Sequence, residues 1–165
     1  MMKIILFLLI FISCTQESKV TDQQVEQHCQ DLNILYQKIE VISSNIANVK
    51  TTRTPEGGFY KRKIAKDCKN GFCQIVSSQE SPILIYQPNH PDADKTGYVA
   101  YPNINLQEEE AQKIRWERVY STVIEHSPVS KDFFFKDPRA KKCFDKYPNL
   151  KEALDFSEYL GRKLH

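Results

Sequence analysis

The sequence predicts an α+β fold, with a long N-terminal helix, a small antiparallel β-rich middle, a second helix and a helical C-terminal tail. Apolar residues near the start of the chain recur at alternating spacings of three and four, and turn-forming residues separate short β-prone stretches in the middle. A second amphipathic stretch follows them. The chain has 165 residues and a formal net charge of +2, so we expect one domain and no dedicated nucleic-acid binding.

The first helix is predicted from a heptad seam of apolar side chains. The seam consists of Val25, His28, Leu32, Leu35, Ile39, Ile42, Ile46 and Val49. This period is typical of a helix that packs along another helix. The helix is expected to end around Asn45 and Asn48, because asparagine tolerates left-handed backbone and caps helix ends. We therefore assign helix packing or partner binding to Leu32, Leu35, Ile39, Ile42, Ile46, Asn45 and Asn48.

The middle of the chain is predicted to form short antiparallel strands. Residues 60–65, 72–78 and 82–86 carry β-branched and aromatic side chains between turn signals, and we expect them to form a small sheet or half of a sandwich. Residues 98–101 are predicted to form a further short strand, which Pro102 ends. Residues 88–97 contain too many turn formers for helix or continuous strand.

The second helix is predicted to begin after Asn105, a suitable N-cap. Glu108, Glu109 and Glu110 follow in the first turn, where the helix dipole favours acids, and we assign them to the helix start. The helix should end before Pro128, which cannot continue the hydrogen-bond ladder. Its apolar stripe consists of Trp116, Val119, Tyr120, Val123 and Ile124.

Two sequence blocks give the chain a family resemblance. They are SNIANVKTTRTPEGGFYKRK at residues 44–63 and NHPDADKTGYVAYPNINLQEE at residues 89–109, with Arg118 and Tyr120 following in the second helix. Together they resemble the FlgC family, the proximal rod protein of the bacterial flagellar basal body, over residues 24–124. The resemblance implies a structural subunit with paired terminal helices, whose partners are other rod proteins or the basal body. It implies no catalysis, cofactor or small-molecule substrate, and gives Arg118 and Tyr120 a helix-packing or partner-binding role.

The N-terminus departs from that family. A short basic start, nine apolar residues and Ser13-Cys14 are typical of a secretory signal over residues 1–13. Ser13-Cys14 also resembles a lipobox, so Cys14 is the expected lipidation site, with residues 14–21 as a tether. This places the chain in the periplasm on a lipid anchor, and Thr15 favours the outer membrane over the inner. The alternatives are a plain secretory signal cut nearby or a short anchor helix.

The C-terminus departs as well. Residues 22–126 are the expected rod-protein-like domain, whereas 127–165 form an extension in place of further turns of the second helix. Asp137-Pro138 and residues 149–160, closed by Gly161, are helical candidates, and Phe133-Phe134-Phe135 needs burial. We expect this extension to fold back onto the domain and to occupy the face that polymer neighbours would use.

Four cysteines besides Cys14 suggest two disulfides in an oxidising compartment. Cys68 and Cys73 flank an Asn-Gly turn and can meet across a hairpin. Cys29 and Cys143 would then form the remaining pair. The spacings match no standard zinc pattern.

The other candidates for chemistry are expected to be structural. Asp92-Ala93-Asp94 lacks the glycine and distant glutamate of a calcium loop and is interpreted as a turn held by Asx bonds. The Lys61-Arg62-Lys63 cluster is interpreted as a solvated strand edge and His28 as a packed or paired side chain. We therefore expect no metal site.

Two functions remain. One is a non-catalytic structural subunit of the flagellar rod. The other is a periplasmic, membrane-tethered lipoprotein adaptor that retains the rod-protein fold without polymerising.

Overall fold

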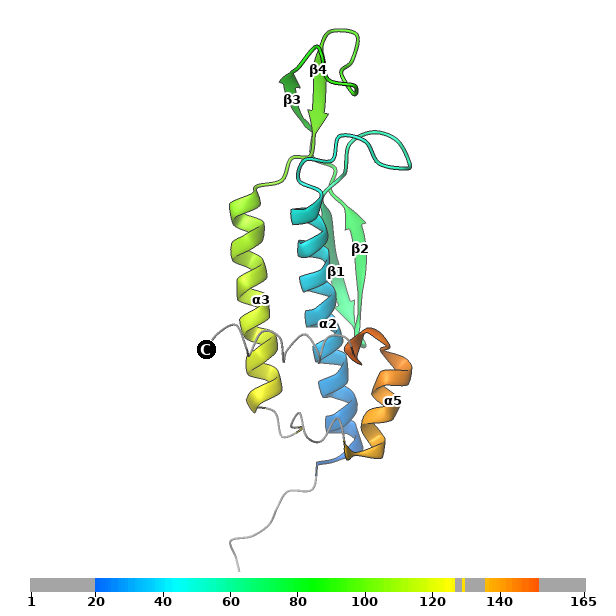
Figure 1. The fold of residues 1–165 in the computed structure, drawn as a ribbon. Helices are drawn as coiled ribbons and strands as arrows, with labels where there is room; N and C mark the ends of the chain where they lie inside the picture. The colour runs from blue at the N-terminus through cyan, green and yellow to red at the C-terminus, as the bar shows by residue number, and fades with distance from the viewer. Residues whose placement is uncertain (1–19, 127–128, 130–135, 152–165) are drawn as a thin grey trace, which may run out of the picture.

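The computed structural model describes residues 20–126, 129 and 136–151, and is α+β as predicted (Figure 1). Several predictions concern residues outside this part: the signal over 1–13, Cys14, Pro128, Phe133-Phe134-Phe135 and the helical candidate beyond Lys151. The described part is elongated, with two long helices side by side and a hairpin projecting at one end.

The long helix α2 spans Asp22–Ala47. A capping box fixes its start, because the Thr21 side chain accepts from the Gln24 amide while the Gln24 side chain accepts from the Thr21 amide. Asn48 is the C-cap, with φ −106° and ψ 11°. The helix therefore ends at the predicted asparagines and Asn48 caps it as expected, but without adopting left-handed backbone.

The strands form two separate hairpins, and the prediction of one sheet or half-sandwich was wrong. In the first, β1 (Lys63–Lys69) pairs antiparallel with β2 (Phe72–Ser77); in the second, β3 (Ile83–Tyr86) pairs with β4 (Tyr98–Tyr101). The first hairpin lies along α2, whereas the second projects beyond the helix ends (Figure 1). β1 starts three residues later than predicted, because Tyr60 instead donates its amide to the Thr51 carbonyl at 2.9 Å.

The second helix α3 spans Leu106–His126 and runs antiparallel to α2 (Figure 1). The Asn105 side chain accepts from the Glu108 amide at 3.2 Å, as an N-cap does. Tyr120 and Ile124 are buried, and Trp116 and Val123 pack against the core. Val119 is 38% exposed, so its placement in the stripe was wrong. α3 packs mainly on one neighbour, α2, which covers a narrower face than the predicted stripe.

The short helix α5 spans Pro138–Lys146 and lies beside the N-terminal half of α2 (Figure 1). Asp137 is its N-cap and accepts from the Arg139 amide at 2.8 Å. Pro138 occupies the first helical position, where its missing N–H costs nothing. The predicted start at Asp137-Pro138 is confirmed.

The main core lies where α2, α3 and α5 meet. From α2 it takes apolar seam side chains, and from α3 it takes Tyr120 and Ile124. The C-terminal part adds a group that the repeat pattern of the first helix could not include. The core as a whole consists of Val25, Cys29, Leu32, Leu35, Ile39, Tyr120, Ile124, Val129, Ala140, Cys143, Tyr147 and Leu150.

Candidate functional site

A buried amide near the end of α2 joins three elements. Asn45 is 1% exposed. Its Oδ1 accepts from the Tyr60 hydroxyl at 3.0 Å and from the Lys63 amide at 2.8 Å, and its Nδ2 donates to the Lys63 carbonyl at 2.9 Å and to Glu109 Oε2 at 3.1 Å. Asn45 lies in the last turn of α2, at the predicted helix end, but its side chain does more than end the helix. It fixes the start of β1 and the first turn of α3 against this helix.

Glu109 carries the charge of this group. Its Oε1 accepts from Arg62 Nε, and the Arg62 Nη2 lies at the same oxygen, each at 2.6 Å. A buried carboxylate is tolerated only when it is paired and hydrogen-bonded, and Arg62 and Asn45 supply both conditions. Glu109 lies in the first turn of α3 as predicted, and it also binds Asn45 and Arg62. The interpretation of Arg62 as part of a solvated edge was wrong, because its side chain is only 25% exposed and is paired with Glu109. We call Asn45, Tyr60, Arg62, Lys63 and Glu109 the polar hub.

Tyr60 completes the polar hub from the chain that precedes β1. Its ring is buried, and its hydroxyl also lies 3.0 Å from the Ser44 hydroxyl. Burial raises the pKa of the Tyr60 hydroxyl, the hydrogen bond with Ser44 opposes this, and the Glu109 charge adds to it. The hydroxyl therefore stays neutral and donates to Asn45. The hydrogen bonds of the hub hold backbone groups or other side chains of the hub, which suits a rigid joint.

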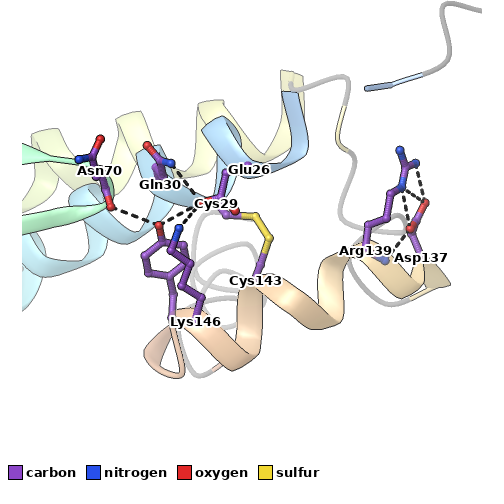
Figure 2. Close-up of a disulfide and its surroundings, with 9 residues drawn as sticks. Glu26, Cys29, Gln30, Asn70, Asp137, Arg139, Cys143 and Lys146 are labelled. Atoms are coloured by element: carbon purple, nitrogen blue, oxygen red, sulfur yellow. Dashed lines mark hydrogen bonds and ion pairs between the residues drawn. A yellow bond between two sulfur atoms is a disulfide. The ribbon is translucent and has the colours of Figure 1, made fainter. Parts of the chain in front are cut away.

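A covalent clamp covers the other end of α2. Cys29 of α2 and Cys143 of α5 form a disulfide with the Cα atoms 6.0 Å apart (Figure 2). The two residues are 114 positions apart, and both are buried. Ala140 and Cys143 present the buried face of α5. The disulfide therefore fixes the C-terminal extension to the seam side of the long helix.

Charged side chains flank the disulfide on both sides. At the start of α5, Arg139 pairs with Asp137 and also reaches the beginning of α2. It donates there to the carbonyl of Val20, which precedes the helix, at 2.8 Å and to Asp22 at 3.1 Å. At the end of α5, Lys146 donates to Glu26 (Figure 2). The hydrogen bond from Lys146 lowers the pKa of Glu26.

Tyr147 extends the clamp to the first hairpin. Its hydroxyl donates to the Asn70 carbonyl at 3.2 Å, and its ring centroid lies 5.3 Å from that of Phe72. A Cβ on Gly71 would lie 2.7 Å from this ring. The clamp thus consists of α5, its disulfide and Tyr147, and it joins α2 to the tip of the β1–β2 hairpin.

The hairpin tip is held by its own disulfide and by α2. Cys68 and Cys73 are bonded, with Cα atoms 4.0 Å apart, around Asn70 and Gly71, whose φ angles of 51° and 86° fit the predicted Asn-Gly turn. The Gly71 carbonyl accepts from Asn33 and Gln37 of α2, each at 2.8 Å. Both disulfides considered from the cysteine spacing are present.

The second hairpin is joined to the loop after α2. Asp92 accepts from the Thr52 hydroxyl at 2.7 Å and pairs with Arg53. Asp94 accepts from the Thr96 hydroxyl and from the Thr96 and Tyr98 amides, as expected for an Asx turn. These bonds, the one from the Thr96 hydroxyl first, lower the pKa of Asp94. Within the described ranges, no group of three or more His, Cys, Asp or Glu side chains could hold a metal.

The remaining predicted site residues lie in different environments. Leu32, Leu35, Ile39 and Ile42 are buried, whereas Ile46 and Asn48 are half-buried. The structure separates the Arg118 and Tyr120 pair, because Arg118 is exposed and Tyr120 is fully buried. The Tyr120 hydroxyl has no hydrogen-bond partner among the described residues, and burial raises its pKa. Sequence reasoning missed the roles of Glu109 and Tyr60 in the polar hub. The available signal for Glu109 was an acidic residue beside the apolar stripe of the second helix.

Comparison with known proteins gives a consistent result. No family model matches the chain. The flagellar basal-body rod protein FlgC of Borreliella burgdorferi is 40% identical over 120 residues, covering 54% of this chain and 79% of that protein. FlgC of Buchnera aphidicola subsp. Acyrthosiphon pisum is 35% identical over 112 residues, covering 61% and 82%. FlgC of Salmonella typhi is 28% identical over 109 residues, covering 60% and 81%. On this similarity, the chain belongs to the family of flagellar basal-body rod protein FlgC.

Proposed function

We propose that this chain is a structural component of the flagellar rod that works in the periplasm, without catalysis. The observation that carries the proposal is its similarity to FlgC over most of the relatives' length. The polar hub adds support, because its hydrogen bonds hold α2, β1 and α3 in a fixed relation, which suits a structural subunit. Its partners would be other rod proteins or the basal body.

We also propose that the chain reaches the periplasm through its N-terminal signal and is held by lipid on Cys14, with the outer membrane favoured over the inner. The sequence of residues 1–14 is the basis of this step. The two disulfides support it, because such bonds persist in oxidising compartments. No helix in the described part of the chain is long and apolar enough to cross a membrane.

The proposed rod-like domain is residues 22–126, with 127–165 as an extension on the same domain. α5 contacts α2, and the seam residues Val25 and Leu32 are buried in the same core as Ala140 and Cys143 of α5, with Cys29 bonded to Cys143. The C-terminal extension would thus occupy surface that a subunit of this kind offers to a neighbouring helix. Leu32, Leu35, Ile39, Ile42, Ile46 and Asn48 would then serve packing within the subunit, and exposed Arg118 would face a partner.

The first experiment is mass spectrometry of purified hook–basal bodies from cells that express the chain. Abundance comparable to that of the other rod proteins is the expected result. Absence from the basal body together with recovery in a membrane fraction would overturn the rod role and leave the membrane-tethered adaptor, which the comparisons do not support.

A Cys14→Ser variant separates anchoring from rod assembly. Membrane recovery should fall in this variant if Cys14 carries lipid, while abundance in basal bodies reports the rod role independently. Unchanged mass and unchanged membrane recovery would contradict lipidation at this position.

A further inference from the structure

Strand β3 has an unprotected apolar edge. Its four residues are all exposed: Ile83 46%, Leu84 60%, Ile85 41% and Tyr86 62%. β4 pairs with one edge, and within residues 20–126, 129 and 136–151 no other strand adjoins β3. Natural edge strands are usually blunted by charges, proline or a bulge. Within its four residues β3 has no charge and no proline, and its pairing with β4 is regular.

The register identifies the backbone groups on the free edge. Tyr86 is opposite Tyr98, and the Gln87 amide donates to the Gly97 carbonyl at 2.8 Å. Hydrogen-bonded and non-bonded pairs alternate along an antiparallel ladder. Ile85 and Ile83 therefore bond to β4, whereas the amide and carbonyl groups of Leu84 and Tyr86 point away from it.

We propose that this edge is a strand-addition site and that its partner is β3 of a second copy of the chain. With a two-fold axis at Ile85, Leu84 of each copy lies opposite Tyr86 of the other. The two pairs exchange four backbone hydrogen bonds, which satisfies every outward-facing group of both residues. The two hairpins then form one four-stranded sheet, with the two Ile85 side chains facing each other.

The chemistry of the edge favours a copy of itself. An uncharged strand with apolar residues on both faces is matched best by another uncharged apolar strand, and β3 is one. The pairing between the two β3 strands also cannot extend beyond these residues. Pro82 and Pro88 occupy the next outward-facing positions and would be opposite each other, and neither has an amide hydrogen. A closed pair is therefore expected rather than an extended sheet.

The hairpin is suited to this role by its position and rigidity. It projects beyond the helix ends (Figure 1). The contacts of Asp92 with Thr52 and Arg53 tie its loop to the body, and the Tyr86 and Tyr98 rings pack edge to face at 5.3 Å. The strand therefore meets a partner without first becoming ordered, which lowers the entropic cost of association. This proposal does not depend on the rod role.

The test combines sedimentation with backbone hydrogen exchange on the full chain in mild detergent, at rising concentration. We expect a monomer–dimer equilibrium in which exchange at Leu84 and Tyr86 slows about ten-fold or more as dimer forms. Leu84→Pro removes one outward amide without removing a bond to β4, because edge proline is tolerated. It should abolish the dimer, while Leu84→Thr, which keeps the amide, should retain it.

Continued protection of the Ile85 amide in Leu84→Pro shows that the hairpin is intact in this variant. A chain that stays monomeric, with Leu84 and Tyr86 amides unprotected at every concentration, would overturn the proposal. So would dimerisation of Leu84→Pro equal to that of the parent. Protection of the two amides only after purified basal bodies are added would replace the second copy with a strand of another protein.

Discussion

Asn45 and Glu109, 64 residues apart in the sequence, are joined by a hydrogen bond of 3.1 Å between the amide Nδ2 and the carboxylate Oε2. Both residues are only 1% exposed. The bond connects the C-terminal part of α2 with the first turn of α3, and Asn45 also binds the backbone of Lys63 at the start of β1. The polar hub therefore sets how the two long helices and the first hairpin meet.

Replacing Asn45 with alanine should destabilise the fold strongly. The change leaves the Lys63 amide and carbonyl and one oxygen of Glu109 without their partner, and each unsatisfied buried group costs about 1–3 kcal/mol. We expect a loss of about 3 kcal/mol or more in urea unfolding. Asn103→Ala, at an exposed position, is the matched control and should change little. Equal effects of both variants would contradict the role of the hub.

The two disulfides should contribute unequally. In the chain-entropy model, the Cys29–Cys143 bond, which closes a separation of 114 residues, contributes about 5 kcal/mol. The Cys68–Cys73 bond, with a separation of 5 residues, contributes about 2 kcal/mol in the same model. Paired Cys→Ala variants measured by denaturant unfolding test this order. A larger loss for the Cys68/Cys73 pair would show that loop closure does not dominate.

Glycine is required at position 71 for two separable reasons. Gly71 has φ +86° and its Cβ would meet the Tyr147 ring at 2.7 Å, whereas Gly57 has φ +92° and nothing within 4 Å. Both alanine variants incur the backbone strain, about 1 kcal/mol. Gly71→Ala should lose about 1–3 kcal/mol more, because the ring must shift in a packed site.

The second effect can be isolated through Tyr147. Gly71→Ala is expected to lose more unfolding free energy than Gly57→Ala. In a double-mutant cycle, this excess should be smaller in a Tyr147→Leu background. An excess that stays the same with leucine at position 147 would show that the ring is not its cause.

The contact between Glu26 and Lys146 should make a pH-dependent contribution to stability. The pKa of Glu26 is lowered, first by the Lys146 hydrogen bond, from an ordinary value of 4.5. Because the pKa of Glu26 is lower in the folded protein than in the unfolded chain, the Glu26–Lys146 contact stabilises the fold above pH 4.5. This stabilisation is lost as the pH falls through the folded-state pKa of Glu26. Because both side chains are over 40% exposed, solvent screening keeps it to about 1 kcal/mol at most.

Glu26→Gln provides the measurement. The difference in unfolding free energy between parent and variant should be largest at neutral pH and low salt, and should shrink below pH 4.5. A difference that is constant with pH would show that the carboxylate charge is not the source.

Tyr120→Phe should be neutral or stabilising. The Tyr120 ring is fully buried, and its hydroxyl has no hydrogen-bond partner in the described part of the chain. Removing an unsatisfied buried hydroxyl recovers its desolvation cost, about 1 kcal/mol. Thermal unfolding of the variant checks this, with Tyr86→Phe, at a 62% exposed residue, as the control. A loss of stability in Tyr120→Phe alone would show that the hydroxyl makes a favourable contact.

Local pattern in the sequence was enough for the helices, because capping and periodicity act over a few residues. Thr21 and Asp137 are N-caps with their own local partners, and Leu32 and Ile39 recur at the spacing that one helix face requires. The Asn-Gly turn at residues 70 and 71 also follows from local backbone preference. The same reasoning wrongly placed Val119 in the buried stripe of α3. The spacing of apolar residues in a helix does not show how wide a face the adjacent helix covers.

The sequence alone determined the long seam helix, the hairpin turn, the cysteine pairs that could form and the family resemblance, since each depends on residues close together or on a recognisable block. Only the tertiary structure decided that Asn45 and Glu109 form one buried hub, that Arg62 neutralises it, and that the strands form two separate hairpins. It also placed Tyr147 against Gly71 and left β3 exposed. These relations join residues tens of positions apart, and burial, which determines the energy of a polar group or an apolar edge, exists only once the chain has folded.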